Sequence, residues 1–130
     1  VVDRSGSIGT ENWQQVVKYM KDRVGRIDFT GASGNRLGIV VYSTFSSVAC
    51  ALQHNAADLL RCIDGIEYTG GWTNTAQGIQ DAGTQLDQYS SSSRTRLIEV
   101  ITDGRAQLWN GDPWTTQQTR QRAAEQQEKG

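Results

Sequence analysis

Hydrophobic residues recur along the chain with two different spacings, and these spacings predict the order of its elements. Apolar residues three and four positions apart predict helices over residues 10–27, 56–66 and 75–89. Thr10 followed by Glu11 predicts the start of the first helix. Short β-branched or alternating runs predict strands at residues 1–2, 37–42, 47–52 and 97–101. Residues 115–129 have good helix propensity without a clear apolar stripe, so we expect a weakly packed last helix there.

These elements predict the fold class. Strands that alternate with helices are joined by right-handed crossovers, which produce a mostly parallel sheet. We therefore expect an α/β fold with a doubly wound, Rossmann-like central sheet and helices on both faces. Residues 37–42 and 97–101 are apolar enough for central strands. Residues 47–52 alternate, and we expect them to form one antiparallel edge strand, paired through a turn at residues 43–46.

Length and charge exclude several classes of partner. The 130 residues fit one domain, and 13 basic and 14 acidic residues give a net charge of -1 with no basic stripe. We therefore expect no nucleic-acid partner. No apolar run approaches the roughly 20 residues that span a bilayer, so we expect no direct membrane insertion.

The two cysteines leave the redox compartment open. Cys50 and Cys62 fit either a short-loop disulfide in an oxidising compartment or two buried free thiols. Together with the single His54 they are too few for a structural zinc site, which normally takes four ligands.

A glycine-rich segment at residues 30–38 resembles a dinucleotide-binding loop. Such a loop needs a strand before it and a helix after it, because the phosphates bind at the helix N-terminus. Here a predicted helix precedes the glycines and a predicted strand follows them. We therefore assign no cofactor-binding residues.

Oxygen-bearing side chains follow the predicted strands at one edge of the sheet. Asp3, Ser5 and Ser7 share one loop, Thr73 precedes a predicted helix, and Asp103 ends the strand at residues 97–101. Any one of these residues taken alone more commonly caps a helix or opens a turn. The topology brings all of them to one crevice, and hydroxyl and carboxylate oxygens are the donors that Mg²⁺ prefers. The set therefore predicts a metal site at this edge.

Three segments carry a resemblance to a known family, in the family's order: Asp3-Arg4-Ser5-Gly6-Ser7-Ile8, Gly70-Gly71-Trp72-Thr73-Asn74-Thr75 and Val100-Ile101-Thr102-Asp103-Gly104. They resemble the metal-ion-dependent adhesion site of von Willebrand factor type A domains, a pattern shared by integrin inserted domains and by matrix proteins such as matrilins and collagen VI. The resemblance implies that Asp3, Ser5, Ser7 and Thr73 surround Mg²⁺, or Mn²⁺ or Ca²⁺. It also implies that Asp103 reaches the ion through water and that a partner's Asp or Glu completes the shell.

The resemblance extends over nearly the whole chain. Members of the family normally continue past their last helix into another strand and a C-terminal helix. We therefore expect one domain over residues 1–130 that lacks the start of its first strand and the family's last strand and helix, with neighbouring domains in the full-length chain.

Three further residues are candidates for partner contact. Trp72 and Trp109 fall in loops near the predicted site, where an aromatic side chain either anchors a partner or packs the loop, and the sequence leaves both open. Arg105 stands where several relatives carry an acid; its charge either attracts acidic ligands or points to solvent, and solvent is favoured.

Three functions compete for this sequence. The first is a cation-dependent protein-binding module, secreted or displayed at the cell surface, without catalytic residues. The second is an intracellular scaffold subunit of the same fold. Free thiols at the two cysteines would favour this second function, whereas a disulfide would favour the first. The third is a metal-dependent phosphoryl-transfer enzyme with Asp3 as nucleophile. It is disfavoured because such loops usually carry a second carboxylate where this chain has Ser5.

Overall fold

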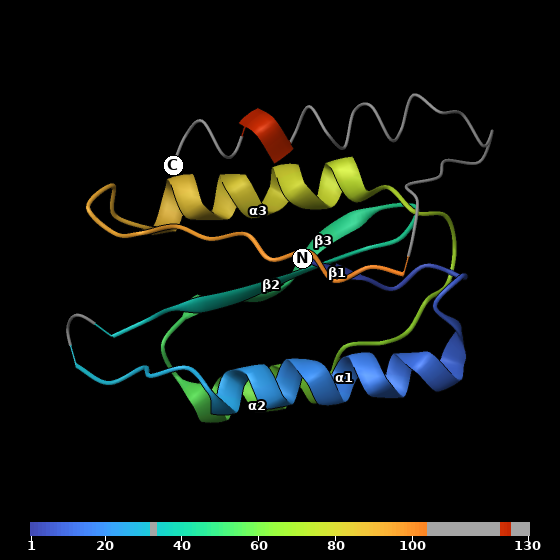
Figure 1. Ribbon diagram of the computed structural model, residues 1–130, viewed down its shortest axis with the longest axis horizontal. Coiled ribbons are helices and arrows are strands. Elements are labelled where there is room, and N and C mark those ends of the chain that lie inside the picture. The colour runs from blue at the N-terminus through green and yellow to red at the C-terminus, as the bar shows by residue number, and fades with distance from the viewer. Residues whose placement is uncertain (32–33, 104–122, 126–130) are drawn as a thin grey trace.

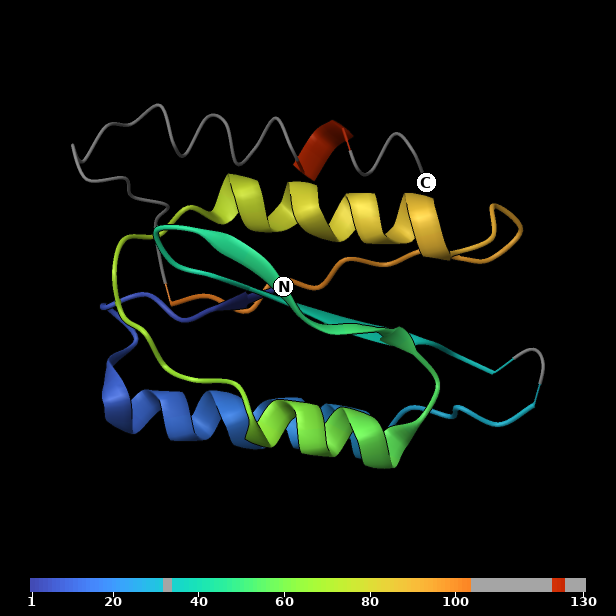
Figure 2. The same ribbon diagram turned by 180° about the vertical axis from the view of Figure 1, so that it is seen from behind.

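The computed structural model describes residues 1–31, 34–103 and 123–125, and it confirms the α/β class (Figure 1). Its elements are, in chain order, β1 (Val2–Asp3), α1 (Gly9–Gly25), β2 (Leu37–Tyr42), β3 (Ser46–Gln53), α2 (Ala56–Asp64) and α3 (Thr75–Tyr89). The strands form a sheet in the order β1-β2-β3. Helices α1 and α2 cover one face and α3 covers the other (Figures 1 and 2). Of the predicted last helix, residues 123–125 are helical and the rest lies outside the described residues.

The sheet follows from the apolar runs. β2 is the central strand, with its last four residues buried, and it pairs in parallel with β1 through Val2–Val41 and Asp3–Tyr42. β3 pairs with β2 in the antiparallel direction, and Cys50 is its buried residue. The prediction of an antiparallel edge strand near residues 47–52 is therefore confirmed.

The prediction of a regular strand at residues 97–101 is wrong. Ile101 forms an isolated parallel bridge with Val2, and its backbone exchanges hydrogen bonds of 2.9 Å with Val1 and Asp3. Further back, residues 95–99 border a cavity of about 580 Å³ whose other walls include Leu37 and Ile39 of β2. The Val1 amine also donates to the carbonyl of Glu99 over 2.8 Å, so residues 99–101 are the part of the segment that is hydrogen-bonded to the start of the chain.

The helices begin and end close to the predicted residues. α1 begins at Gly9, and its N-cap is Ile8, which has no side chain able to accept a hydrogen bond, so the predicted cap by Thr10 is wrong by two positions. α2 ends at Asp64 rather than at residue 66, because Gly65 caps it. α3 spans the predicted residues, and the Asn74 side chain accepts a hydrogen bond from the Gln77 amide. In the part of the chain that is described, no helix is long and apolar enough to cross a membrane.

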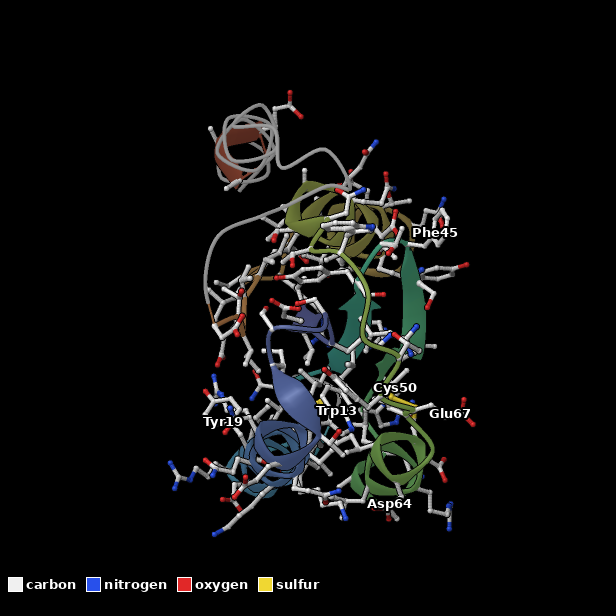
Figure 3. The ribbon with its side chains drawn as sticks, turned by 90° about the vertical axis from the view of Figure 1, so that its right-hand side faces the viewer. Trp13, Tyr19, Phe45, Cys50, Asp64 and Glu67 are labelled. Atoms are coloured by element: carbon white, nitrogen blue, oxygen red, sulfur yellow. A yellow bond between two sulfur atoms is a disulfide. The ribbon has the colours of Figure 1, made fainter. Side chains whose placement is uncertain are left out.

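A disulfide joins Cys50 of β3 to Cys62 of α2, with 6.0 Å between their Cα atoms (Figure 3). It resolves the alternative that the sequence left open. It also fastens the edge strand to the layer in which α1 and α2 lie side by side (Figure 3). Leu59 and Ile63 of α2 pack there with Trp13, Met20 and Val24 of α1.

The packing of α3 against the sheet predicts a stability effect. A Cβ atom at Gly78 would lie 2.7 Å from Cδ1 of Tyr42, whose side chain is fully buried. Gly78→Ala should therefore lower the free energy of unfolding by about 1–3 kcal/mol, measured by chemical denaturation. Gly25→Ala at the end of α1 is the matched control, because nothing lies within 4 Å of its added methyl group. Equal stability of the two variants would contradict this packing.

Candidate metal site

The candidate site lies where the parallel strands β1 and β2 end. After Asp3 the Arg4 amide donates to the carbonyl of Tyr42 over 2.9 Å, which keeps the two chains together for one residue beyond the strands. The first turns of α1 and α3 start at the same edge of the sheet (Figure 1). This edge is the usual place for a ligand site in an open α/β sheet.

Asp3 is the buried anchor of the site. It is 0% exposed, and each oxygen of its carboxylate accepts one hydrogen bond of 2.8 Å, Oδ1 from the Ser5 amide and Oδ2 from the Thr102 hydroxyl. The neighbouring cation, Arg4, donates instead to the carbonyl of Glu67. Within the described residues Asp3 forms no ion pair, so its charge is buried without a counter-charge.

Ser5, Ser7 and Asp103 extend the cluster outward. The hydroxyls of Ser5 and Ser7 lie 3.2 Å apart, and Ser7 donates to Oδ1 of Asp103 over 3.1 Å. Ser5 is fully buried, whereas Ser7 and Asp103 are exposed. The oxygens therefore run from the interior to the surface, and residues far apart in sequence meet through them.

Thr73 lies in the adjoining loop and is 5% exposed. That loop is held against the first one because the Gly6 amide donates to the carbonyl of Gly71 over 2.9 Å. Gly71 has φ +97°, and a Cβ atom there would lie 2.8 Å from Oγ1 of Thr44. The tight crossing thus requires glycine, and Thr73 follows two residues later in the same loop.

This donor set fits a hard divalent cation. Two carboxylates and three hydroxyls offer only oxygen, which suits Mg²⁺, Mn²⁺ or Ca²⁺. Beneath the site the Tyr42 hydroxyl accepts a hydrogen bond from Thr75 over 3.1 Å. Burial raises the pKa of Tyr42 to about 12, with hydrogen bonds from Thr75 and Thr102 opposing the rise and the charges of Asp3 and Asp103 adding to it. The phenol therefore stays neutral and adds no charge to the site.

Of the three residues predicted to contact a partner, the structure describes one. Trp72 lies directly before Thr73 and is 43% exposed, so it is available at the surface of the site. Arg105 and Trp109 lie outside the described residues, as does the rest of that loop.

Sequence reasoning missed Tyr68, which clamps the metal loop. Its hydroxyl donates to the carbonyl of Ser5 over 2.8 Å and accepts from the Gly9 amide over 3.1 Å, so it links the loop to the first turn of α1. Its ring packs on Trp13, with the ring centroids 5.6 Å apart. Tyr68 is 63 positions from Ser5, and no local pattern marks it.

The chain matches the model of the von Willebrand factor type A domain over residues 1–129. Among curated relatives, vitrin from Mus musculus is 29% identical over 108 residues, which are 82% of this chain and 16% of vitrin. The collagen alpha-1(XXI) chain from Homo sapiens is 31% identical over 109 residues, 82% of this chain and 11% of the collagen chain. The chain thus spans less than a fifth of the length of these relatives.

Solved structures with the same fold include proximal thread matrix protein 1 from the mussel byssus. One of its structures, described as having a zinc-occupied MIDAS motif, matches with a TM-score of 0.69 and 25% identity over 81% of this chain and 28% of that one. A second crystal form matches with a TM-score of 0.75 and 21% identity over 99% of this chain and 32% of that one.

The Tyr68 clamp predicts a local effect. Tyr68→Phe keeps the ring on Trp13 but leaves the Gly9 amide without its partner, so the variant should be about 1–2 kcal/mol less stable. Hydrogen exchange at the Gly9 amide should accelerate more than at amides within β2. Tyr89→Phe at the exposed end of α3 is the matched control and should change neither quantity. Unchanged exchange at Gly9 in Tyr68→Phe would rule the clamp out.

Proposed function

Because the chain belongs to the von Willebrand factor type A domain family, we propose that it is a cation-dependent protein-binding module. Asp3, Ser5, Ser7 and Thr73 hold one divalent cation, Mg²⁺ or else Mn²⁺ or Ca²⁺, and Asp103 reaches it through water. The partner is a protein that presents an Asp or Glu side chain to the ion.

The buried Asp3 carboxylate is the observation that carries this proposal. Two neutral hydrogen bonds hold the carboxylate in place, and in the described part of the chain no cationic side chain balances it. A divalent cation between Asp3 and the hydroxyls of Ser5 and Ser7 supplies the missing charge. Both the negative charge of Asp3 and the oxygen donors of the three side chains favour a divalent cation at this position.

The small number of carboxylates explains why the partner must be acidic. Asp3 and Asp103 carry the negative charge of the site, while Ser5, Ser7 and Thr73 contribute neutral oxygens. A bound cation supplies an electrophilic position that an external carboxylate can fill. The residues of this chain hold that position open at the surface, because Ser7 and Asp103 are exposed whereas Asp3 and Ser5 are buried.

The relatives support an extracellular, non-enzymatic role. They include collagen chains, and one structural neighbour is named a matrix protein. The Cys50–Cys62 disulfide agrees with an oxidising compartment, which favours a secreted or cell-surface protein over an intracellular scaffold. The fully buried Ser5 stands where a phosphoryl-transfer enzyme would usually carry a second carboxylate, which argues against catalysis.

Thermal melting with Mg²⁺, Mn²⁺ or Ca²⁺ against excess chelator tests the site. A cation that binds only the folded state should add about 2.7 kcal/mol at a hundred times its Kd, seen as a rise in Tm. Asp3→Asn keeps the shape of the side chain but removes the charge, and it should abolish the rise. Asp103→Ala, at the exposed end of the cluster, should weaken it.

Asp22→Ala is the matched control, because this carboxylate is exposed on α1 and lies outside the cluster. It should retain the full rise in Tm. A wild-type protein whose Tm is the same with millimolar cation and with chelator would refute the metal site.

A further inference from the structure

Two exposed aromatic residues, Phe45 and Trp72, stand on two loops that are hydrogen-bonded to each other, and Trp72 directly precedes Thr73 of the candidate site. Phe45, in the turn between β2 and β3, is 81% exposed, and Trp72 is 43% exposed. Figure 3 views this edge of the molecule and shows Phe45 beside β3. A single exposed aromatic residue is ordinary on a protein surface. Two of them on adjoining loops next to one site need a further explanation.

The loops that carry them are fastened together by their backbones. The Trp72 amide donates to Oγ1 of Thr44 over 3.0 Å, and the Asn74 amide donates to the carbonyl of Ser43 over 2.8 Å. Within the turn, the Ser43 amide donates to the carbonyl of Phe45 over 2.9 Å. These bonds hold the backbone around Phe45 close to the backbone around Trp72.

The two chain segments that carry the aromatic residues contain no charged residue. Residues 42–53 and residues 68–80, which contain Phe45 and Trp72, have no Asp, Glu, Lys or Arg. The carboxylates Asp3 and Asp103 stand on the other loops of the site. These two segments therefore offer a partner uncharged, partly apolar residues.

We infer that Phe45 and Trp72 form an aromatic shelf that binds an apolar side chain of the partner, one or two residues from the acidic residue at the ion. This inference rests on the proposed function, and it names the partner as a peptide segment with a large aliphatic or aromatic residue beside its Asp or Glu. Rigid aromatic side chains suit this task, because they offer large contact area and lose little conformational freedom on binding. The fixed backbone of both loops lowers the cost of ordering them further.

A peptide array tests the shelf. Its peptides are Gly-Ser sequences with one central Glu, in which each neighbouring position carries every amino acid in turn. Binding of the domain is read in Mg²⁺ and in chelator. The wild type should retain peptides only in Mg²⁺, and it should bind those with Leu, Ile, Phe or Trp beside the Glu about tenfold more strongly than those with Gly or Ser.

Phe45→Ser and Trp72→Ser should each reduce this preference to about threefold or less, while the rise in Tm with Mg²⁺ stays the same. Tyr89→Ser is the matched control, since Tyr89 is 59% exposed at the far end of α3. It should keep the full preference.

The outcomes separate the shelf from the metal site. Retention in Mg²⁺ without regard to the neighbouring residue, or a preference that survives both Ser variants, would overturn the shelf and leave the proposed function standing. A wild type that retains none of the Glu peptides in Mg²⁺ would overturn both.

Discussion

The candidate site depends on one buried carboxylate. Asp3 ends the two-residue strand β1, and its backbone pairs with β2 on one side and with Ile101 on the other. Its side chain is therefore fixed by the sheet itself and cannot turn away to solvent. Because the burial of a charge without a counter-charge is costly, the hydrogen bonds from the Ser5 amide and the Thr102 hydroxyl to this carboxylate are central to the site.

The surrounding loops are held by backbone groups and by a few long-range side chains. The Tyr68 hydroxyl donates a hydrogen bond to the carbonyl of Ser5, and the Gly6 amide donates to the carbonyl of Gly71. The Thr44 hydroxyl accepts a hydrogen bond from the Trp72 amide. None of these contacts lies within one loop. The geometry of the site is therefore a property of the packed α/β layers, and rigid elements hold such a constellation more firmly than isolated loops do.

The fold class was predicted correctly from the amino-acid sequence, and so, closely, were the positions of β2, β3 and α3. These three elements have regular apolar spacing, and polar residues such as Asn74 stand at their ends. The sequence also predicted that Asp3, Ser5, Ser7 and Asp103 meet, because parallel strands bring their carboxyl ends to one edge. It failed where the decisive contact is long-range. The role of Tyr68 depends on how a segment 63 residues away crosses the loop. The pairing of residues 99–101 depends on backbone contacts with Val1 and Asp3, at the other end of the described sequence.

The oxygens of the cluster also satisfy one another, and this bears on how an ion would enter. Ser5 and Ser7 are within hydrogen-bond distance of each other, and Ser7 donates to Asp103, so these oxygens lie close together. In the proposed site a cation would exchange these hydrogen bonds for coordination by the same oxygens. Asp3 is held differently, because each oxygen of its carboxylate accepts a hydrogen bond, one from the Ser5 amide and one from the Thr102 hydroxyl. The arrangement thus combines one rigid anionic ligand with neutral ligands that can reorient, which suits a site that binds a cation and still leaves it a position for an external carboxylate.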